Sequence, residues 1–190
     1  MSFIIGNFFA ILLAFMRMSQ KPWLKYPARI YISFMRGVPM LVVLFILYFG
    51  LPYVGIQIPA LLYAIIGFST VSAAYMAEIF RSSISAVDKG QWEAAQSLGL
   101  PQKPIIHHII LPQALRIAVA PTCNVIIDMV KSSSLAAMIT VPDIFQNAKI
   151  IGGREYDYMS MYILITFIYW VLSFILELLQ GQVEKRLTVY

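Results

Sequence analysis

The sequence predicts an all-α integral membrane protein with about five transmembrane helices, folded as one domain over residues 1–190. Hydrophobic residues make up 60% of the chain and charged residues only 12%, whereas roughly a quarter of a soluble domain is charged. The mean hydropathy is +0.78. The apolar residues are gathered into long runs, and a run of about 20 such residues can cross a bilayer as a helix.

The first apolar run covers residues 2–16 and ends at Arg17. As a helix it rises about 24 Å, which is less than the ~30 Å hydrocarbon core of a bilayer. A secretory signal is the rival interpretation, but no basic segment precedes the run and no small-residue cleavage site follows it. We therefore expect a first transmembrane helix that is short at its N-terminal end.

Four further spans are expected at residues 30–53, 59–80, 113–130 and 159–179. Residues 17–29 read as a basic connection between the first two spans. Residues 135–144 are too few to cross a membrane and fit an interfacial or re-entrant helix. Residues 146–158 are polar and rich in glycine, so we expect a loop there.

The longest polar interval, residues 89–112, carries a short helix with signals at both ends. Asp88 can cap its N-terminus, with Gln91 completing a capping box. Gly99 can adopt the left-handed conformation that closes a helix, and Pro101 prevents its continuation. A helix of about ten residues is unstable alone, so it needs a partner to pack against.

The same interval predicts a docking surface for that partner. Ala94, Ala95 and Leu98 would let the partner approach closely along one side of the helix. Trp92 would supply a large anchor of the kind that dominates protein interfaces. An ordinary solvated loop between two spans is the alternative interpretation.

The spacing EAA-x3-G-x9-I-x-LP resembles the EAA loop of ABC importer permeases, and every specified position matches from Glu93 to Pro112. Residues 34–39 (FMRGVP) are similar to FRGTP in the polar amino-acid branch of that family, and residues 73–81 (AAYMAEIFR) to AAYLAEIFR. Residues 131–135 (KSSSL) match KDTSL only in part. The resemblance implies a type I importer permease fold in which the loop is a cytoplasmic coupling helix docked on an ATPase. The implied coupling residues are Lys89, Gly90, Trp92, Glu93, Ala94, Ala95, Leu98, Gly99, Ile109, Leu111 and Pro112.

Charged residues within the expected spans are candidates for the substrate pathway. Asp128 and Lys131 share a helix face, and an unpaired charge in mid-membrane costs about 2.5–3.5 kcal/mol. We therefore expect them to pair and to face the bundle interior or a water-filled cavity, with Asn124 on the same side. The resemblance implies contact with the charged ends of a solute; a structural ion pair is the alternative.

Glu78 is the other pathway candidate. It is expected to pair with Arg81 one helical turn away, and this structural role competes with a role in an ion pathway. For Arg36, a base that snorkels to the membrane interface is favoured over a substrate ligand.

The basic residues predict the orientation of the spans. Most of the 14 Lys and Arg side chains fall on the side of the EAA loop, and only Lys149 and Arg154 fall on the other. Cytoplasmic loops carry such an excess. The chain is therefore expected in the cell membrane with its N-terminus outside and its C-terminus in the cytoplasm. These bases flank spans and form no single basic face, which argues against binding to nucleic acid.

The residues present no catalytic or metal-binding constellation. His107 and His108 are adjacent and so point in different directions on a helix, and the phosphate-binding pattern GxxxxGK[ST] is absent. The resemblance implies that the chain is not an enzyme and holds no cofactor, while ATP and magnesium are bound by a partner ATPase. The implied partners are a cytosolic ATPase dimer, a second permease copy or paralogue, an extracellular solute-binding protein, membrane lipid and a polar amino-acid substrate.

Two other functions remain open at this stage. An ATPase-independent carrier or channel is one, although such carriers often contain inverted repeats and no convincing repeat is present. A degenerate or regulatory membrane subunit is the other, suggested by the short first span.

Overall fold

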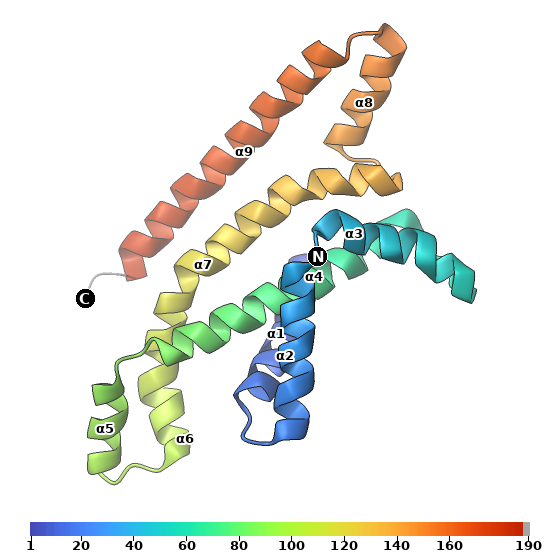
Figure 1. The fold of residues 1–190 in the computed structure, drawn as a ribbon. Coiled ribbons are helices and arrows are strands. Elements are labelled where there is room, and N and C mark those ends of the chain that lie inside the picture. The colour runs from blue at the N-terminus through green and yellow to red at the C-terminus, as the bar shows by residue number, and fades with distance from the viewer. Residues whose placement is uncertain (188–190) are drawn as a thin grey trace.

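A computed structural model describes residues 1–187, and these form helices joined by short connections, which confirms the all-α prediction (Figure 1). The α-helices are α1 (Ser2–Met18), α2 (Pro22–Gly37), α3 (Met40–Phe45), α4 (Ala60–Ser85), α5 (Lys89–Ser97), α6 (Gln102–Pro104), α7 (Leu111–Ser132), α8 (Ile144–Glu155) and α9 (Tyr158–Leu187). Two π-helical segments, η1 (Ile46–Gly50) and η3 (Ile105–Ile110), and two 3₁₀ segments, η2 (Leu51–Val54) and η4 (Ser133–Ile139), connect them.

Within the described residues, three helical segments are long and apolar enough to cross a membrane: Ala60–Ser85, Gln102–Ile139 and Tyr158–Leu187. A fourth span results if α2 and the segment Met40–Val54 cross as one bent unit. The fifth apolar segment is the shorter α1. The expected apolar segments are thus all helical, but only three of them belong to single helical segments long enough to cross a membrane.

The expected single span at residues 30–53 is wrong in its start and in its shape. The helix begins eight residues earlier because Pro22 fits the first helical turn, where backbone N–H groups have no intrahelical acceptor. It then breaks by 105° before Met40. Val38 precedes a proline and is held in an extended conformation, and Pro39 has no N–H to continue the helix.

The loop expected at residues 146–158 is also wrong, because most of it forms α8. Asp143 caps this helix by accepting a hydrogen bond from the backbone N–H of Gln146 at 2.7 Å. Glycine at position 152 lets the start of α9 pack closely against α8, since a Cβ there would lie 3.1 Å from the Cα of Tyr158.

The span expected from residue 113 also starts earlier, because it belongs to a helical segment that begins at Gln102. Pro112 lies in the first turn of α7, directly after the π-helical turn of η3, so the helical segment continues through this proline.

The closest helix pairing joins α1 to α4. Small residues at four-residue spacing on α1, namely Gly6, Ala10 and Ala14, are buried against α4. A Cβ added to Gly6 would collide with Oγ of Ser72 and lie 3.0 Å from the carbonyl oxygen of Ser69. This is the small-xxx-small packing that lets membrane helices approach closely.

We expect Gly6→Ala to destabilise the protein, because overpacking costs about 1–3 kcal/mol. Gly50→Ala is the matched control, since a Cβ at that helical glycine meets nothing within 4 Å. Thermal unfolding in detergent should show a lower midpoint for Gly6→Ala only. Equal midpoints for the two variants would contradict the close α1–α4 contact.

Candidate functional site

Helix α5 lies at the end of the molecule opposite to α8, between α4 and the α6–α7 segment (Figure 1). Asp88 caps it as expected, although Oδ1 accepts its hydrogen bond from the N–H of Gly90 at 2.6 Å. The expected capping box is not completed as predicted: the side chain of Gln91 instead accepts from Nε2 of Gln113 at 3.4 Å. Gly99 has the expected left-handed conformation, with φ of +72°.

A small hydrophobic core fastens α5 to the start of α7. It consists of the buried residues Val87, Ala95, Ile105, Ile110 and Ala114, with Ile84, Trp92 and Ile109 packed against it. The core joins the end of α4, the inner face of α5 and the segment that leads into α7. The three elements are therefore packed as one unit.

The packing corrects the expected docking surface. Ala95 is only 3% exposed and belongs to the chain's own core, so it does not share an outward side with Ala94 and Leu98. Trp92 is half-buried against the same core and anchors α5 internally. Ala94 and Leu98, four residues apart, remain exposed, and Leu98 has 79% of its surface accessible. The other predicted coupling positions, Lys89, Gly90, Glu93 and Pro112, are exposed, while Leu111 is half-buried.

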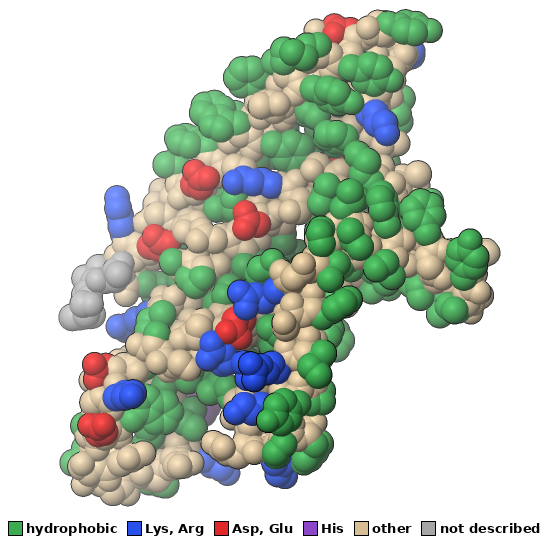
Figure 2. Space-filling model, viewed as in Figure 1, with side chains coloured by type: hydrophobic (Ala, Val, Ile, Leu, Met, Phe, Trp, Pro, Cys, Tyr) green, Lys and Arg blue, Asp and Glu red, His purple; other side chains and the backbone are tan. Residues whose placement is uncertain are grey.

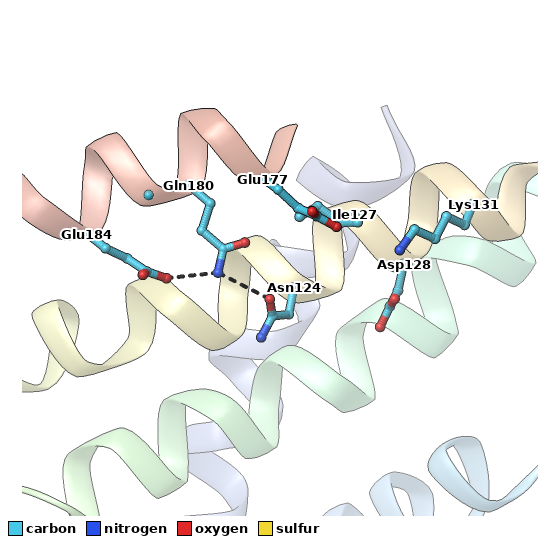
Figure 3. A pocket seen from close by; sticks show the side chains of 8 residues that line it. Asn124, Ile127, Asp128, Lys131, Glu177, Gln180 and Glu184 are labelled. Atoms are coloured by element: carbon cyan, nitrogen blue, oxygen red, sulfur yellow. Dashed lines mark hydrogen bonds between the residues drawn. The ribbon is translucent and has the colours of Figure 1, made fainter. Parts of the chain in front are cut away.

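A polar cavity of about 480 Å³ lies between α7 and α9 (Figure 3). Its lining residues are Asn124, Ile127, Asp128 and Lys131 from α7 and Glu177, Gln180, Gly181 and Glu184 from α9. The amide of Gln180 links the two helices by donating to Asn124 at 3.2 Å and to Glu184 at 2.8 Å. With three carboxylates and one ammonium group among its lining residues, this cavity has an acidic character.

A second cavity, of about 460 Å³, lies on the other side of α7 against the break between α2 and α3. It is lined by Arg36, Gly37, Val38, Pro39, Met40, Phe68, Val71, Ser72, Tyr75, Val125, Asp128, Met129, Lys131 and Ser132. The guanidinium of Arg36 lies over the ring of Tyr75, 5.5 Å from its centroid. This cavity therefore combines two basic groups, one carboxylate and three hydroxyls.

Asp128 and Lys131 line both cavities, as their predicted position toward the bundle interior requires. Their expected ion pair is not formed: within the described residues the ion pairs are Glu78–Arg81 and Arg154–Glu155. In Figure 3 the carboxylate of Asp128 points away from Glu177 and Gln180, toward α4. Since the cavities surround these side chains, each charge can be hydrated without the other.

Glu78 forms the predicted structural pair and lines neither of the two cavities. Arg81 donates from Nε at 3.0 Å and from Nη2 at 2.6 Å to its two carboxylate oxygens. A bidentate pair of this kind occupies both oxygens. The structure thus separates Glu78 from Asn124, Asp128 and Lys131, with which it was grouped as a pathway candidate.

Sequence reasoning missed the polar residues of α9 and the position of Arg36. Glu177, Gln180 and Glu184 recur at intervals of three and four residues within a strongly apolar helix. That spacing places them on one face of the helix, so the sequence could have predicted a polar face that turns away from lipid. Nothing in the sequence could place Arg36 in the same cavity as Asp128, because that arrangement depends on the break between α2 and α3 and on the packing of α4.

Apolar helices that can span a membrane, with cavities lined by charged side chains between them, are typical of a membrane transport subunit. The chain belongs to the family of binding-protein-dependent transport system inner membrane components, whose model matches residues 6–189. This confirms the resemblance drawn from the EAA motif.

Curated relatives place the chain among amino-acid ABC transporter permeases. It is 56% identical to the probable amino-acid ABC transporter permease YckA of Bacillus subtilis, over all of this chain and 84% of that protein. It is 39% identical to the L-cystine transport system permease TcyB of the same organism, over 100% of this chain and 82% of TcyB. Such permeases are translocation subunits, so the chain is not an enzyme and ATP is hydrolysed by a separate subunit.

Solved structures agree with this assignment. A crystal structure of an amino acid ABC transporter with histidines matches with a TM-score of 0.94 and 36% identity, covering 97% of this chain and 86% of that one. The inward-facing MetNI methionine ABC transporter matches with a TM-score of 0.76 at 20% identity, covering 98% and 88% respectively. This second likeness supports the fold alone.

Proposed function

We propose that the chain is the permease subunit of an ATP-driven, binding-protein-dependent importer of a polar L-amino acid, and that residues 1–190 act as one translocation domain. Helix α5 would be the coupling helix that docks on a cytosolic ATPase dimer. The observation that carries the proposal is the two-sided structure of α5: Ala95 on its inner face packs into the core shared with α4 and α7, while Ala94 and the C-cap residue Leu98 are exposed. An exposed leucine at the end of a short helix suits insertion into an apolar groove of a partner.

The second cavity supplies the chemistry that an amino acid requires. Its basic groups, Arg36 and Lys131, can bind the carboxylate of a solute, and Asp128 can bind its ammonium group. Charge of both signs within one cavity matches a zwitterion better than it matches a simple anion or cation. We infer that Asp128 and Lys131 contact the solute and that Glu78 holds the bundle together instead.

The remaining partners follow from the same proposal. A second permease copy, or a related chain, would complete the pathway, and an extracellular binding protein would deliver the solute. The N-terminus would lie outside and the C-terminus in the cytoplasm, since α5 would then meet the ATPase. Most Lys and Arg side chains on the face shown in Figure 2 gather over its lower half, the end that carries α5, in keeping with this orientation. The ATPase would bind ATP and magnesium.

Leu98→Glu should abolish the stimulation of ATP hydrolysis by solute-loaded binding protein. The measurement uses the transporter in lipid, with this chain co-expressed beside its ATPase and with binding protein loaded with candidate amino acids. Burying a glutamate in place of leucine in an apolar groove leaves a charge without a partner. Leu98→Met is the matched control, because it keeps the apolar contact, and it should retain stimulation.

Two results would contradict this role. Stimulation by loaded binding protein that persists in Leu98→Glu would show that α5 does not insert this side chain into the ATPase. Failure of any ATPase to co-purify with the wild-type chain would favour an ATPase-independent carrier or a regulatory subunit. The amino acid that stimulates hydrolysis in the wild type would identify the substrate.

A further inference from the structure

The N-terminal part of the chain carries a positive charge that no carboxylate compensates. Residues 1–77 contain five basic residues, Arg17, Lys21, Lys25, Arg29 and Arg36, and no acidic residue. The first carboxylate, that of Glu78, is occupied by Arg81. Within the described residues, no ion pair involves Lys21, Lys25 or Arg29, and all three are exposed.

These three bases form a row along α2. Lys21, Lys25 and Arg29 are spaced by four residues, which places them one above the other on one side of the helix. The next residues on this side of α2 are the buried Ile32 and the uncharged Ser33, so the basic row ends at Arg29. The row therefore covers only the half of α2 that adjoins the turn from α1.

An apolar row runs along the same helix on a different side. Trp23, Tyr26, Ile30 and Phe34 recur at intervals of three and four residues, and each is more than half exposed. Trp23 and Ile30 both have 68% of their surface accessible. The ammonium group of Lys21 lies 5.8 Å from the centroid of the Trp23 ring, so basic and apolar groups meet at the first turn of α2.

We propose that this part of α2, the basic row with Trp23, binds the headgroup of an anionic phospholipid. The phosphate would lie against Lys21, Lys25 and Arg29, and the acyl chains would lie along Trp23 and Ile30. A helix with basic residues on one face and Trp, Tyr and Phe on another is suited to the boundary between headgroups and acyl chains. Basic residues at the cytoplasmic ends of membrane helices bind anionic headgroups in the same way.

The neighbouring apolar row favours lipid over the ATPase as the occupant. A docked soluble protein would neutralise the bases but would not provide the hydrophobic environment that the exposed Tyr26, Ile30 and Phe34 require. The boundary of a bilayer can satisfy both rows, because anionic headgroups and acyl chains meet there. The leaflet concerned is the cytoplasmic one in the proposed orientation.

Brominated lipids can test this site through the fluorescence of Trp23. The full chain carrying Trp92→Phe and Trp170→Phe keeps Trp23 as its one tryptophan, since the sequence contains three. It is placed in phosphatidylcholine nanodiscs that contain either brominated phosphatidylglycerol or brominated phosphatidylcholine at the same low fraction. We expect stronger quenching by the brominated phosphatidylglycerol, with a preference of about fivefold for each basic residue that contacts the headgroup.

Lys25→Gln with Arg29→Gln should lower that preference by about tenfold or more. Lys25→Arg with Arg29→Lys keeps both charges and should preserve it. Lys149→Gln with Arg154→Gln removes two bases from α8, at the far end of the molecule, and should also preserve it. Circular dichroism of each variant checks that the helices remain folded.

Equal quenching by the two brominated lipids in the otherwise unchanged chain would overturn the proposal. So would a preference for phosphatidylglycerol that survives in a folded Lys25→Gln, Arg29→Gln variant. In either case, protection of Lys25 from an amine-reactive reagent by added ATPase would assign the basic row to that partner. None of these readouts depends on solute transport, so the lipid site and the proposed importer function can fail separately.

Discussion

Trp92→Ala is expected to leave ATP hydrolysis by the assembled importer largely intact while lowering solute uptake by about tenfold. Trp92 packs on the core that joins α5 to Ile105 and Ile110. Removing a fully buried tryptophan side chain costs about 3–5 kcal/mol, and a half-buried one is expected to cost about half as much. Helix α5 would then still meet the ATPase through Leu98 but would move independently of α7.

The measurement compares hydrolysis with uptake in the same proteoliposomes. Trp92→Phe retains most of the apolar contact and should keep the two rates coupled. A parallel fall of hydrolysis and uptake in Trp92→Ala would instead indicate that this side chain contacts the ATPase, as an exposed interface anchor would.

Asp128→Asn is expected to weaken solute binding by roughly 10- to 100-fold, because a hydrogen bond to a charged group contributes about 1.5–3 kcal/mol. The amide keeps the size of the side chain but cannot attract an ammonium group. Asp128→Glu keeps the charge and should lose less. The apparent affinity is measured as the solute concentration that half-saturates uptake at constant expression.

Asp157→Asn is the matched control for Asp128→Asn. Asp157 is exposed beside α9 and accepts a hydrogen bond from the N–H of Ser160, remote from both cavities. Its substitution should leave affinity unchanged. If Asp128→Asn left the affinity for every transported solute unchanged, the carboxylate would have no role in recognition and the second cavity would serve only to hydrate it.

Local signals predicted those parts of the structure that depend on a few neighbouring residues. The cap at Asp88, the left-handed Gly99 and the pair of Glu78 with Arg81 are all determined within one helical turn. The membrane class followed from composition in the same direct way. Each of these features needs no knowledge of how distant segments pack.

Features that depend on packing between distant segments could not be predicted. Ala95 and Leu98 lie three residues apart and look equally suited to a partner, yet the core beneath α5 buries the first and leaves the second exposed. Asp128 and Lys131 looked like a pair because an uncompensated charge is costly in lipid. Both side chains line cavities on the two sides of α7, where water can hydrate each charge without an ion pair. The position of such cavities depends on the packing of distant segments, so a single sequence does not reveal it.

Helix α4 can also transmit motion, because it runs without interruption from the second cavity to the residues just before α5. Ser72 and Tyr75 line the second cavity, and the same helix continues without glycine or proline to Ser85, just before α5. That interval is a stiff rod of about 20 Å. A tilt of about 10° at the cavity would displace the far end by about 3 Å, by lever geometry over that length. A solute that tilts α4 at the cavity would therefore displace the end of α4 beside α5 by about 3 Å, because no glycine or proline within this interval would absorb the motion.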